Sequence, residues 1–242
     1  LAFFRTGHAG LDAPQDHAFI ALIDKLACKL GVKYILNGYN ISTEVVSNPK
    51  SWEDNAGYSG DGTYIKDVIR KHCDIKIKNY TFTSGFKHKV WIPYVLGVKT
   101  LKPLNLVPIT KTQMVDTLVN EYGYEPYGQK HFEDLLTKFI EGWWLPTRFG
   151  YDIRKAQLSS LVTTGQMTRD DALAILENPP LSEEESMELF KIVAEKMGIS
   201  EEELWRLHKL PECTEKYRSQ EWLYTLGIRL FTLLGIEKRI RK

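Results

Sequence analysis

Gly38, Asn40 and Glu44 form the first stretch of this sequence that could do chemistry, because they come directly after a short apolar run. A glycine at such a position lets a ligand approach the backbone closely. The Asn40 amide has both donor and acceptor groups, and the Glu44 carboxylate could hold a metal, a sugar hydroxyl or a cation. A strand-to-helix turn capped by Ser42 or Thr43 explains the same residues, and spacing alone leaves both interpretations open.

Lys111 is the second candidate, since it falls in the first turn of a predicted helix, just after a proline-containing segment. A cation at this position opposes the helix dipole, which suggests that it has another task. A lysine beside a nucleotide can neutralise the charge that develops on pyrophosphate. An ordinary exposed lysine is the simpler explanation, and spacing alone favours it.

The third candidate is a short run after Gly128 that contains Lys130, His131 and Glu133. These side chains could bind an anionic substrate, and His131 could also move a proton near neutral pH. A loop that enters a helix, with Glu133 in the first turn, accounts for the same run. Spacing alone favours that plainer interpretation.

The fourth candidate combines Asp152 and Arg154 with the more distant Arg169. Arginine holds phosphate or carboxylate through two parallel hydrogen bonds, so either arginine could bind a substrate group. Salt bridges within a helical bundle are the alternative, and composition alone favours them.

The elements that position these candidates follow from hydrophobic periodicity and capping patterns. A helix over 16–30 that ends at Gly31, followed by a buried strand over 32–36, is half of a doubly wound α/β unit. In such units ligands lie at the carboxyl ends of the strands. On the helix over 16–30, one face carries Phe19, Ile20, Ile23, Leu26, Ala27 and Leu30.

The pattern also predicts a strand around Ile75, Ile77 and Phe82 and a broken strand over 95–107. Helices are predicted over 64–71, 110–122 (with Met114, Leu118 and Val119 inward), 132–143, 152–162 and 215–234, with helix starts at Thr168, Ser182 and Ser200. We expect the Trp143–Trp144 pair and the leucine stripe Leu223, Leu226, Leu230 and Leu234 to lie in the core, although the stripe could instead face a partner.

Composition narrows the function classes. The chain has 242 residues, 43% of them hydrophobic, which suffices for one large domain or two small ones. The net charge of +1 does not favour nucleic-acid binding. The three cysteines form no C-x-x-C pair, which fits a reducing cytoplasm and argues against a metal site in this chain. We find neither a signal peptide nor an apolar run long enough to span a membrane.

Residues 127–176 carry the most specific pattern, YGQKHFEDLLTKFIEGWWLPTRFGYDIRKAQLSSLVTTGQMTRDDALAIL. This stretch resembles the N-acetyl sugar amidotransferase family, PP-loop ATPases of lipopolysaccharide O-antigen and related sugar biosynthesis. The family pattern there is similar to YGGKH-[YF]-ES followed by LP-x-x-FG-x-DKR-x-x-HLSSLI-x-SGQ-x-TR-x-x-AL. A second match covers PQDHAF at 14–19 and LNGYNISTE at 36–44, so the resemblance extends over nearly the whole chain.

The resemblance implies an α/β fold: a partial adenine-nucleotide α-hydrolase-like parallel sheet over 1–126 and a helical C-terminal region over 127–242 for substrate or partner. ATP, with Mg²⁺, would adenylate the acyl oxygen of a nucleotide-linked N-acetyl sugar. Ammonia would then displace AMP and leave an acetamidino group. The ammonia would come from a class I glutaminase subunit, docked together with a cyclase-like subunit.

The resemblance also assigns roles to individual residues. Lys111 and Lys130 would stabilise phosphate and adenylate charge, His131 would shuttle a proton, and Arg154 would hold a substrate carboxylate or phosphate. The remaining assignments are Gly38, Asn40 and Glu44 on the nucleotide side, and Gln15, Asp16, Glu133, Asp152 and Arg169 on the substrate side.

The sequence departs from the family pattern in several places. Asp134 replaces a serine, Ile153 a lysine and Gln157 a histidine, and the last two weaken any role of this helix in proton transfer. The Ser-Gly-Gly-x-Asp-Ser loop that wraps pyrophosphate is absent, as are the preceding cysteine pairs that would bind zinc. We therefore expect these residues to be part of a longer protein and to bind ATP weakly on their own.

Two alternative functions stay open from the sequence. One is a tRNA-modifying PP-loop ATPase, which the near-neutral charge does not favour. The other is a non-catalytic module that docks a glutaminase through its C-terminal helices. The sequence names neither the sugar nor the oligomeric state, and a homo-oligomer is compatible with it.

Overall fold

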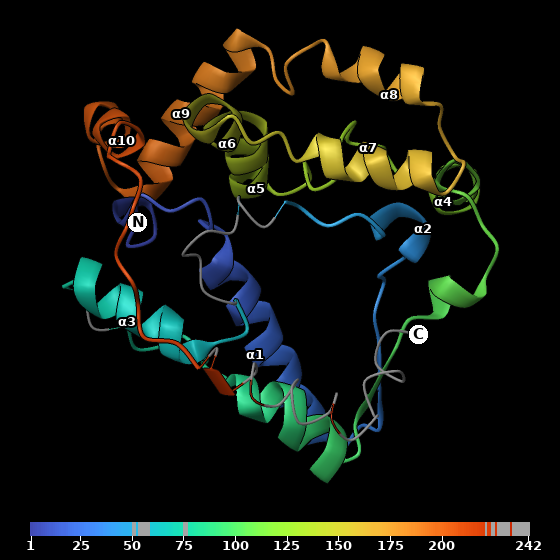
Figure 1. Ribbon diagram of the computed structural model, residues 1–242, viewed down its shortest axis with the longest axis horizontal. Helices are drawn as coiled ribbons and strands as arrows, with labels where there is room; N and C mark the ends of the chain where they lie inside the picture. The colour runs from blue at the N-terminus through green and yellow to red at the C-terminus, as the bar shows by residue number, and fades with distance from the viewer. Residues whose placement is uncertain are drawn as a thin grey trace. The chain divides into compact units, whose positions relative to one another are not determined.

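The computed structural model describes residues 1–49, 52, 59–74, 77–220, 222, 223, 226 and 233. Over these residues the chain is mostly helical and contains one two-stranded parallel sheet (Figure 1). The predicted α/β character is confirmed in this coarse sense. The elements in chain order are η1 (Phe4–Thr6), α1 (Ala13–Leu30), β1 (Tyr34–Leu36), α2 (Ile41–Glu44), α3 (Gly62–His72), η3 (Lys87–Val95), β2 (Lys99–Leu101), η4 (Pro103–Leu106), α4 (Lys111–Tyr122), α5 (Leu135–Phe139), η5 (Ile140–Trp144), α6 (Leu145–Phe149), α7 (Arg154–Thr163), α8 (Arg169–Leu176), α9 (Glu183–Met197) and α10 (Glu201–His208).

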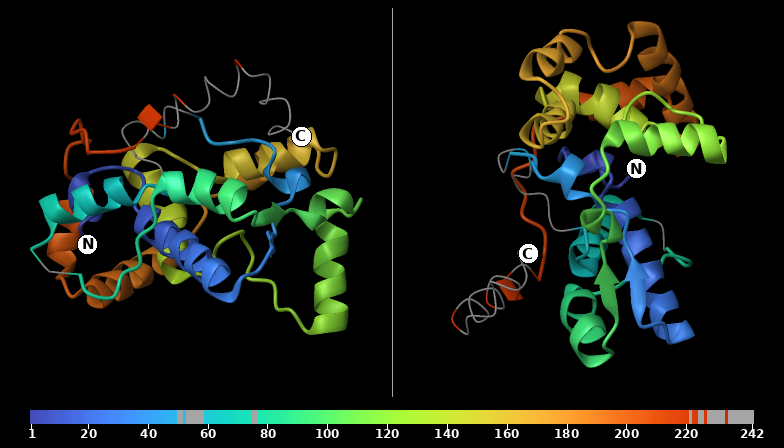
Figure 2. Two further views of the ribbon diagram at one scale, coloured as in Figure 1. Left: turned by 90° about the horizontal axis from the view of Figure 1, so that it is seen from below. Right: turned by 90° about the vertical axis from the view of Figure 1, so that its right-hand side faces the viewer.

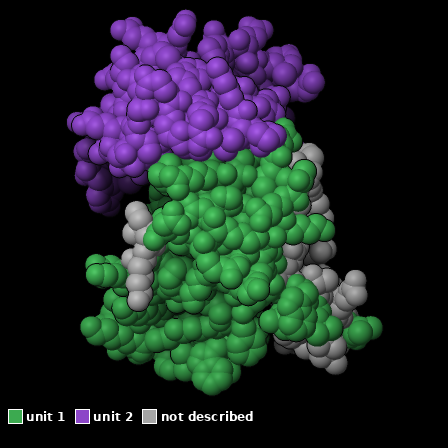
Figure 3. Space-filling view, turned by 90° about the vertical axis from the view of Figure 1, so that its left-hand side faces the viewer, with its two compact units in different colours: residues 1–35, 55–99, 212–242 green, residues 36–54, 100–211 purple. Residues whose placement is uncertain are grey.

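The chain divides into two compact units, each built from separate stretches of sequence (Figure 3). Unit 1 comprises residues 1–35, 55–99 and 212–242, and unit 2 comprises residues 36–54 and 100–211. The sequence suggests a different division, with one boundary between residues 126 and 127, and that division remains a prediction. No described helix is long and apolar enough to cross a membrane.

Unit 1 is organised around α1, which packs against α3 and η3. The α3 side chains Tyr64, Ile65 and Val68 are fully buried, together with Phe3 and Phe4 from the start of the chain. The predicted helix over 64–71 is confirmed, and it begins two residues earlier with Asp61 as its cap. A second small cluster unites Ala27, Ile92 and Val98.

Helix α1 buries a face of small and polar residues. His17 and Asp24 are buried beside Ala21 and Ala27. The imidazole of His17 has a partner on each nitrogen: Nδ1 lies 2.7 Å from the Ser59 carbonyl, and Nε2 accepts from the Thr83 N–H at 3.2 Å. The large apolar side chains that share the predicted amphipathic face stay exposed over the described residues, namely Phe19, Ile23, Leu26 and Leu30.

The strand predicted around residues 75–82 is wrong for its described part, because residues 77–83 form no strand. Ile75 lies outside the described residues. Side chains rather than a backbone ladder hold this segment on α1. Tyr80 donates to the Pro14 carbonyl at 2.5 Å, and the Thr83 hydroxyl donates to Asp24 at 3.0 Å.

The parallel sheet consists of β1 and β2, which lie side by side in Figure 2. Lys99 N–H donates to the Lys33 carbonyl and Asn37 N–H donates to the Leu101 carbonyl, each at 2.8 Å. The predicted strand over 32–36 is confirmed, but the expectation that it is buried is wrong, since Tyr34 and Leu36 are exposed. Ile35, between them, is partly buried against Ala27, Ile92 and Val98, so one face of the strand is covered while the face with Tyr34 and Leu36 is not.

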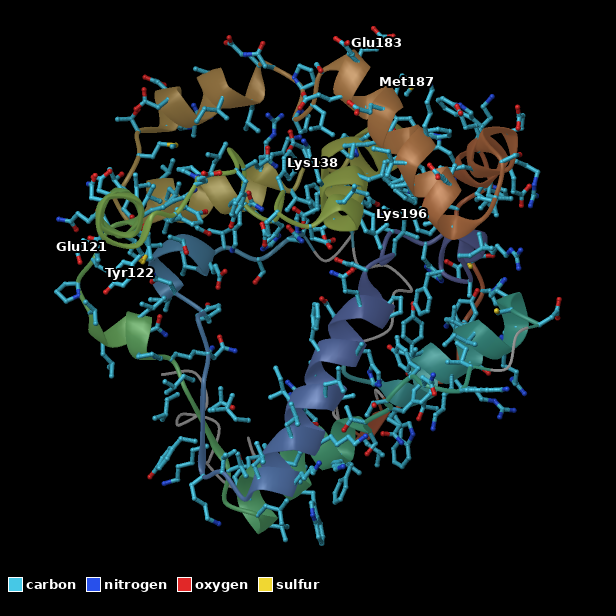
Figure 4. All side chains as sticks on the ribbon, turned by 180° about the vertical axis from the view of Figure 1, so that it is seen from behind. Glu121, Tyr122, Lys138, Glu183, Met187 and Lys196 are labelled. Atoms are coloured by element: carbon cyan, nitrogen blue, oxygen red, sulfur yellow. The ribbon has the colours of Figure 1, made fainter. Side chains whose placement is uncertain are left out.

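The helices of unit 2 begin where the capping patterns predict. Thr110 and Ser182 each form a reciprocal capping box with the residue three positions later, and Thr168 and Ser200 cap α8 and α10. Glu183 in the first turn of α9 and Lys196 in its last turn complement the helix dipole (Figure 4). The predicted helix over 132–143 starts at Leu135 instead, because Asp134 caps it.

The core of unit 2 is aromatic. Phe139 and Trp144 are buried on the continuous stretch α5–η5–α6, as predicted for the Trp143–Trp144 pair. Phe190 of α9 packs edge-on against Trp143, and Trp205 of α10 packs against Phe190 in a tilted arrangement with ring centres 4.8 Å apart. Helix α4, in contrast, has no buried residue, so the inward positions predicted for Met114, Leu118 and Val119 are wrong.

The predicted long helix over 215–234 is not helical up to residue 220. Most of its remainder, with Leu230 and Leu234 of the predicted leucine stripe, lies outside the described residues. The described part is tied to α3 in unit 1. Arg218 N–H donates to Asp67 at 2.9 Å, and Lys71 pairs with Glu215 at 2.5 Å.

Candidate functional site

Unit 2 contains a cavity of about 450 Å³. This size lies within the roughly 300–1,000 Å³ of small-molecule sites. Its walls come from the turn before α2, from α2 itself, from α4, from the loop over 124–130 and from α7, with Met167 and Ile175 completing it. The cavity therefore follows directly after β1, where the α/β pattern places a ligand.

The side chain of Gln166 connects the walls. Its Oε1 accepts from the Lys111 N–H at 2.7 Å, and its Nε2 donates to the Ser42 carbonyl at 2.8 Å. Thr164 at the end of α7 donates to the same Ser42 carbonyl at 2.7 Å. One glutamine thus fastens the start of α4 and the α7–α8 turn to α2.

The cavity brings together six of the residues predicted from the sequence. They come from four separate stretches of chain, and three of them belong to the single motif that follows β1. The six are Gly38, Asn40, Glu44, Lys111, Lys130 and Arg154.

Positive charge dominates the polar part of the cavity. Glu44 is its lining carboxylate, and it forms an ion pair with Lys130. Lys111 has no carboxylate partner among the described residues. Burial of its ammonium, and secondly the charge of Lys130, lower the pKa of Lys111. Two ammonium groups that perturb each other favour an anion between them.

Arg154 is largely occupied by protein partners. Its Nε and Nη2 donate to Asp152 at 2.7–3.2 Å, and Nη2 also donates to the Asn178 carbonyl at 2.8 Å. Nη1 donates to the Ile175 carbonyl at 3.3 Å. Since four of the five guanidinium N–H groups are engaged, Arg154 and Asp152 fasten α7 to the end of α8 before any ligand arrives.

Asn40, rather than the predicted Ser42 or Thr43, is the residue that caps α2, and its role toward a ligand remains a prediction. Its Oδ1 accepts from the Ser42 N–H at 2.9 Å and so caps α2. Its Nδ2 is buried and has no hydrogen-bond partner among the described residues. Gly38 also lines the cavity, and a Cβ added there would meet nothing within 4 Å.

His131 lies outside the cavity lining. Its backbone is left-handed, with φ of 70°, and its Nδ1 lies 3.1 Å from Oε1 of the buried Glu141. This hydrogen bond raises the pKa of His131. Such a backbone is uncommon for a residue with a side chain, and the buried carboxylate helps to hold it.

The other predicted residues lie away from the cavity lining. Arg169 lines a separate groove between α7 and α8 together with Lys155. The pKa of Tyr127 is raised first by its hydrogen bond with Tyr124, then by burial and by the charge of Glu133. Gln15 and Asp16 belong to unit 1. Their expected roles remain predictions.

The cavity contains residues to which the sequence analysis gave no role. Gln129 and Gln157 line it, and the Nε2 of each is buried without a partner among the described residues. Met114, Leu118 and Leu158 form its apolar wall. An uncharged amide has no spacing signature, so only the neighbouring Gly128 and Lys130 could have drawn attention to Gln129.

The described residues do not fit a resident metal. They contain no group of three or more histidine, cysteine, aspartate or glutamate side chains that could hold an ion. The Glu44 carboxylate in the cavity is neutralised by Lys130.

Comparison with known families gives one match. Residues 133–230 are similar to the family model "LPS biosynthesis protein WbpG-like, C-terminal domain". The matched stretch includes α7, and with it the cavity residues Arg154 and Gln157. It supports a link to lipopolysaccharide biosynthesis. No curated protein and no solved structure matches the chain.

Proposed function

We propose that this protein is part of an ATP-dependent amidotransferase of lipopolysaccharide biosynthesis, which converts an N-acetyl group of a nucleotide-linked sugar to an acetamidino group. The observation that carries the proposal is the convergence on one cavity of six predicted residues from four separate stretches of the sequence. The family match over 133–230 supports the biosynthetic context.

The proposed reaction has two steps. The acyl oxygen of the N-acetyl group attacks the α-phosphate of ATP, so pyrophosphate leaves and an O-adenylated imidate forms. Ammonia then adds to the imidate carbon, the C–O bond breaks, and AMP leaves with the former acyl oxygen. Ammonia is proposed to come from a class I glutaminase subunit.

The proposed fold for the first part of the chain is a PP-loop-type parallel sheet, of which β1 and β2 form a portion. The exposed Tyr34 and Leu36 support this assignment, because parallel strands are ordinarily covered on both faces. The exposed apolar face of α1 is consistent with the same view.

Lys111 and Lys130 are the residues that we assign to charge stabilisation. Both line the cavity, and the lowered pKa of Lys111 indicates an ammonium that is partly removed from water. Such an ammonium interacts more strongly with developing phosphate charge than one in bulk solvent. The proposal brings Mg²⁺ in with ATP, because the described residues offer it no site.

The test is the formation of AMP and pyrophosphate by the complete protein with ATP, ammonium and a nucleotide-linked N-acetyl sugar. We expect Lys111→Gln to lower kcat/KM by about 100-fold, the usual scale for losing one preorganised charge-stabilising group. The exposed Lys191 of α9 provides the control, and Lys191→Gln leaves the rate unchanged.

Three outcomes contradict the proposal: no ammonia-dependent AMP with any such sugar, equal rates for Lys111→Gln and Lys191→Gln, or formation of the acetamidino group without ATP. Glutaminase binding in the absence of AMP formation would instead favour the docking module.

A further inference from the structure

Three side-chain amides on the wall of the unit 2 cavity have unused hydrogen-bonding capacity. Asn40 Nδ2, Gln129 Nε2 and Gln157 Nε2 are all buried, and none has a hydrogen-bond partner among the described residues. Asn40 is 4% exposed, and its amide orientation is fixed because Oδ1 caps α2. An unsatisfied buried donor costs roughly 1–3 kcal/mol, so three on one cavity are unusual.

The surroundings of these amides define what could satisfy them. The apolar wall of Met114, Leu118 and Leu158 faces the same cavity, and Lys111 adds a cation without a carboxylate partner among the described residues. Each glutamine also offers its Oε1 as an acceptor, so the wall can pair with both the carbonyl and the N–H of a ligand amide. A complementary ligand carries oxygen acceptors, an anionic group and a small apolar group.

We propose that Gln129 and Gln157, with Asn40, determine specificity by donating to the acyl oxygen and neighbouring oxygens of an N-acylated sugar, while Lys111 binds its phosphate. This assignment rests on the proposed function for the identity of the ligand. The acyl methyl group then packs against the apolar wall. Each glutamine side chain is free to turn its amide toward the ligand, since its Nε2 makes no hydrogen bond among the described residues.

This assignment differs from the resemblance, which places Gly38, Asn40 and Glu44 on the nucleotide side. Competition between the sugar and ATP for the cavity decides between the two.

The test measures binding of three probes to the chain by titration calorimetry: UDP-N-acetylglucosamine, UDP-glucose and ATP. We expect the acetylated sugar to bind on the order of tenfold more tightly than UDP-glucose, the effect of one or two amide hydrogen bonds. Gln157→Leu and Gln129→Leu remove this preference. Lys111→Gln weakens both sugar nucleotides equally.

A stability measurement separates recognition from a structural role. Because Gln157→Leu removes an unsatisfied buried donor, it leaves the melting temperature unchanged or raises it. A lower melting temperature together with equal weakening of both sugars would assign a structural role instead. Equal affinity of the wild-type chain for both sugars, failure to bind either of them, or displacement of the sugar by ATP overturns the assignment.

The two proposals fail differently. If the sugar preference depends on Gln157 but the complete protein forms no ammonia-dependent AMP, this assignment stands and the proposed reaction falls. If AMP forms but Gln157→Leu and Gln129→Leu leave the sugar preference unchanged, the proposed reaction stands and the assignment of the two glutamines falls.

Discussion

The aromatic core and the ligand cavity of unit 2 differ in how they treat buried polar groups. In the core, His208 packs against Trp143 with ring centres 4.7 Å apart, and its Nε2 lies 3.0 Å from the Thr147 hydroxyl. The Arg148 guanidinium beside it donates to the carbonyls of Leu207 and Leu210, each at 2.8 Å. In the cavity, the amide nitrogens of Asn40, Gln129 and Gln157 have no partner among the described residues, whereas the core has Glu141 Oε2 as such an atom.

The two regions also differ in packing. Phe139 and Trp144 are almost completely buried on α5–η5, whereas α4 buries no residue and contributes open walls. Close packing supplies most of the stability of a domain, while an open wall with unused donors contributes little to it. In unit 2, the residues that stabilise the fold are therefore different from the residues that are available to bind a ligand.

Replacing Phe139 should produce the largest effect. Its ring lies 5.4 Å from that of Trp143 and 6.2 Å from that of Phe190, so Phe139→Ala leaves a cavity within the core. We expect the free energy of unfolding to fall by about 3–5 kcal/mol. Urea denaturation followed by tryptophan fluorescence measures the change.

Leu118→Ala on the cavity wall is the matched control, and we expect a loss of under about 1 kcal/mol because Leu118 is already 41% exposed. Similar losses for Phe139→Ala and Leu118→Ala would show that the cavity wall is part of the folding core.

Two glycines offer a smaller and sharper comparison. A Cβ at Gly142 in the core would lie 2.6 Å from Leu181 Cδ1 and 3.1 Å from Phe132, whereas a Cβ at Gly38 meets nothing within 4 Å. Gly142→Ala should cost about 1–3 kcal/mol of stability through overpacking. Gly38→Ala should leave the melting temperature unchanged, and a large loss there would contradict the open cavity.

The smallest effects concern pH, and they have opposite signs for two histidines. Burial, and secondly Arg148, lower the pKa of His208 to about 4. The unfolded chain takes up this proton near pH 6.5, whereas the folded chain takes it up only near pH 4. The free energy of unfolding therefore decreases as the pH is lowered from 6.5 to about 4. His208→Gln should flatten this acid limb of a plot of melting temperature against pH.

His131 behaves in the opposite way, because its hydrogen bond to Glu141 raises its pKa above 6.5. The stabilisation is fully present below pH 6.5 and is lost as pH rises through the folded pKa. His131→Asn, which tolerates the left-handed backbone, should remove the loss on the alkaline side. An unchanged alkaline limb in this variant would show that the Glu141 contact does not form in solution.

Local signals in the sequence predicted the helices well. Thr110 and Ser182 begin helices because a hydroxyl followed by Gln or Glu three residues later satisfies the free N–H groups of a first turn. The strand expected around Ile77 failed because Tyr80 and Thr83 find partners on α1, which no local pattern reveals. The buried face of α1 was equally invisible, since it depends on what packs against it.

The site was predictable only where residues are charged or belong to a motif. The cavity residues Lys111, Lys130 and Glu44 could be predicted from the sequence because they are charged. The partners of Arg154 include backbone carbonyls, which carry no sequence signal. Gln157 stands out only when the three-dimensional structure shows its unused donor.

The hydrogen bonds of Gln166 have a consequence for the thermodynamics of recognition. This side chain fixes α4, α2 and the α7–α8 turn to one another in the absence of ligand. The conformational entropy of ordering these walls is therefore lost on folding rather than on association, which leaves more of the contact energy for affinity. Gln166 does not itself line the cavity, so it offers a position at which affinity can be tuned through rigidity alone.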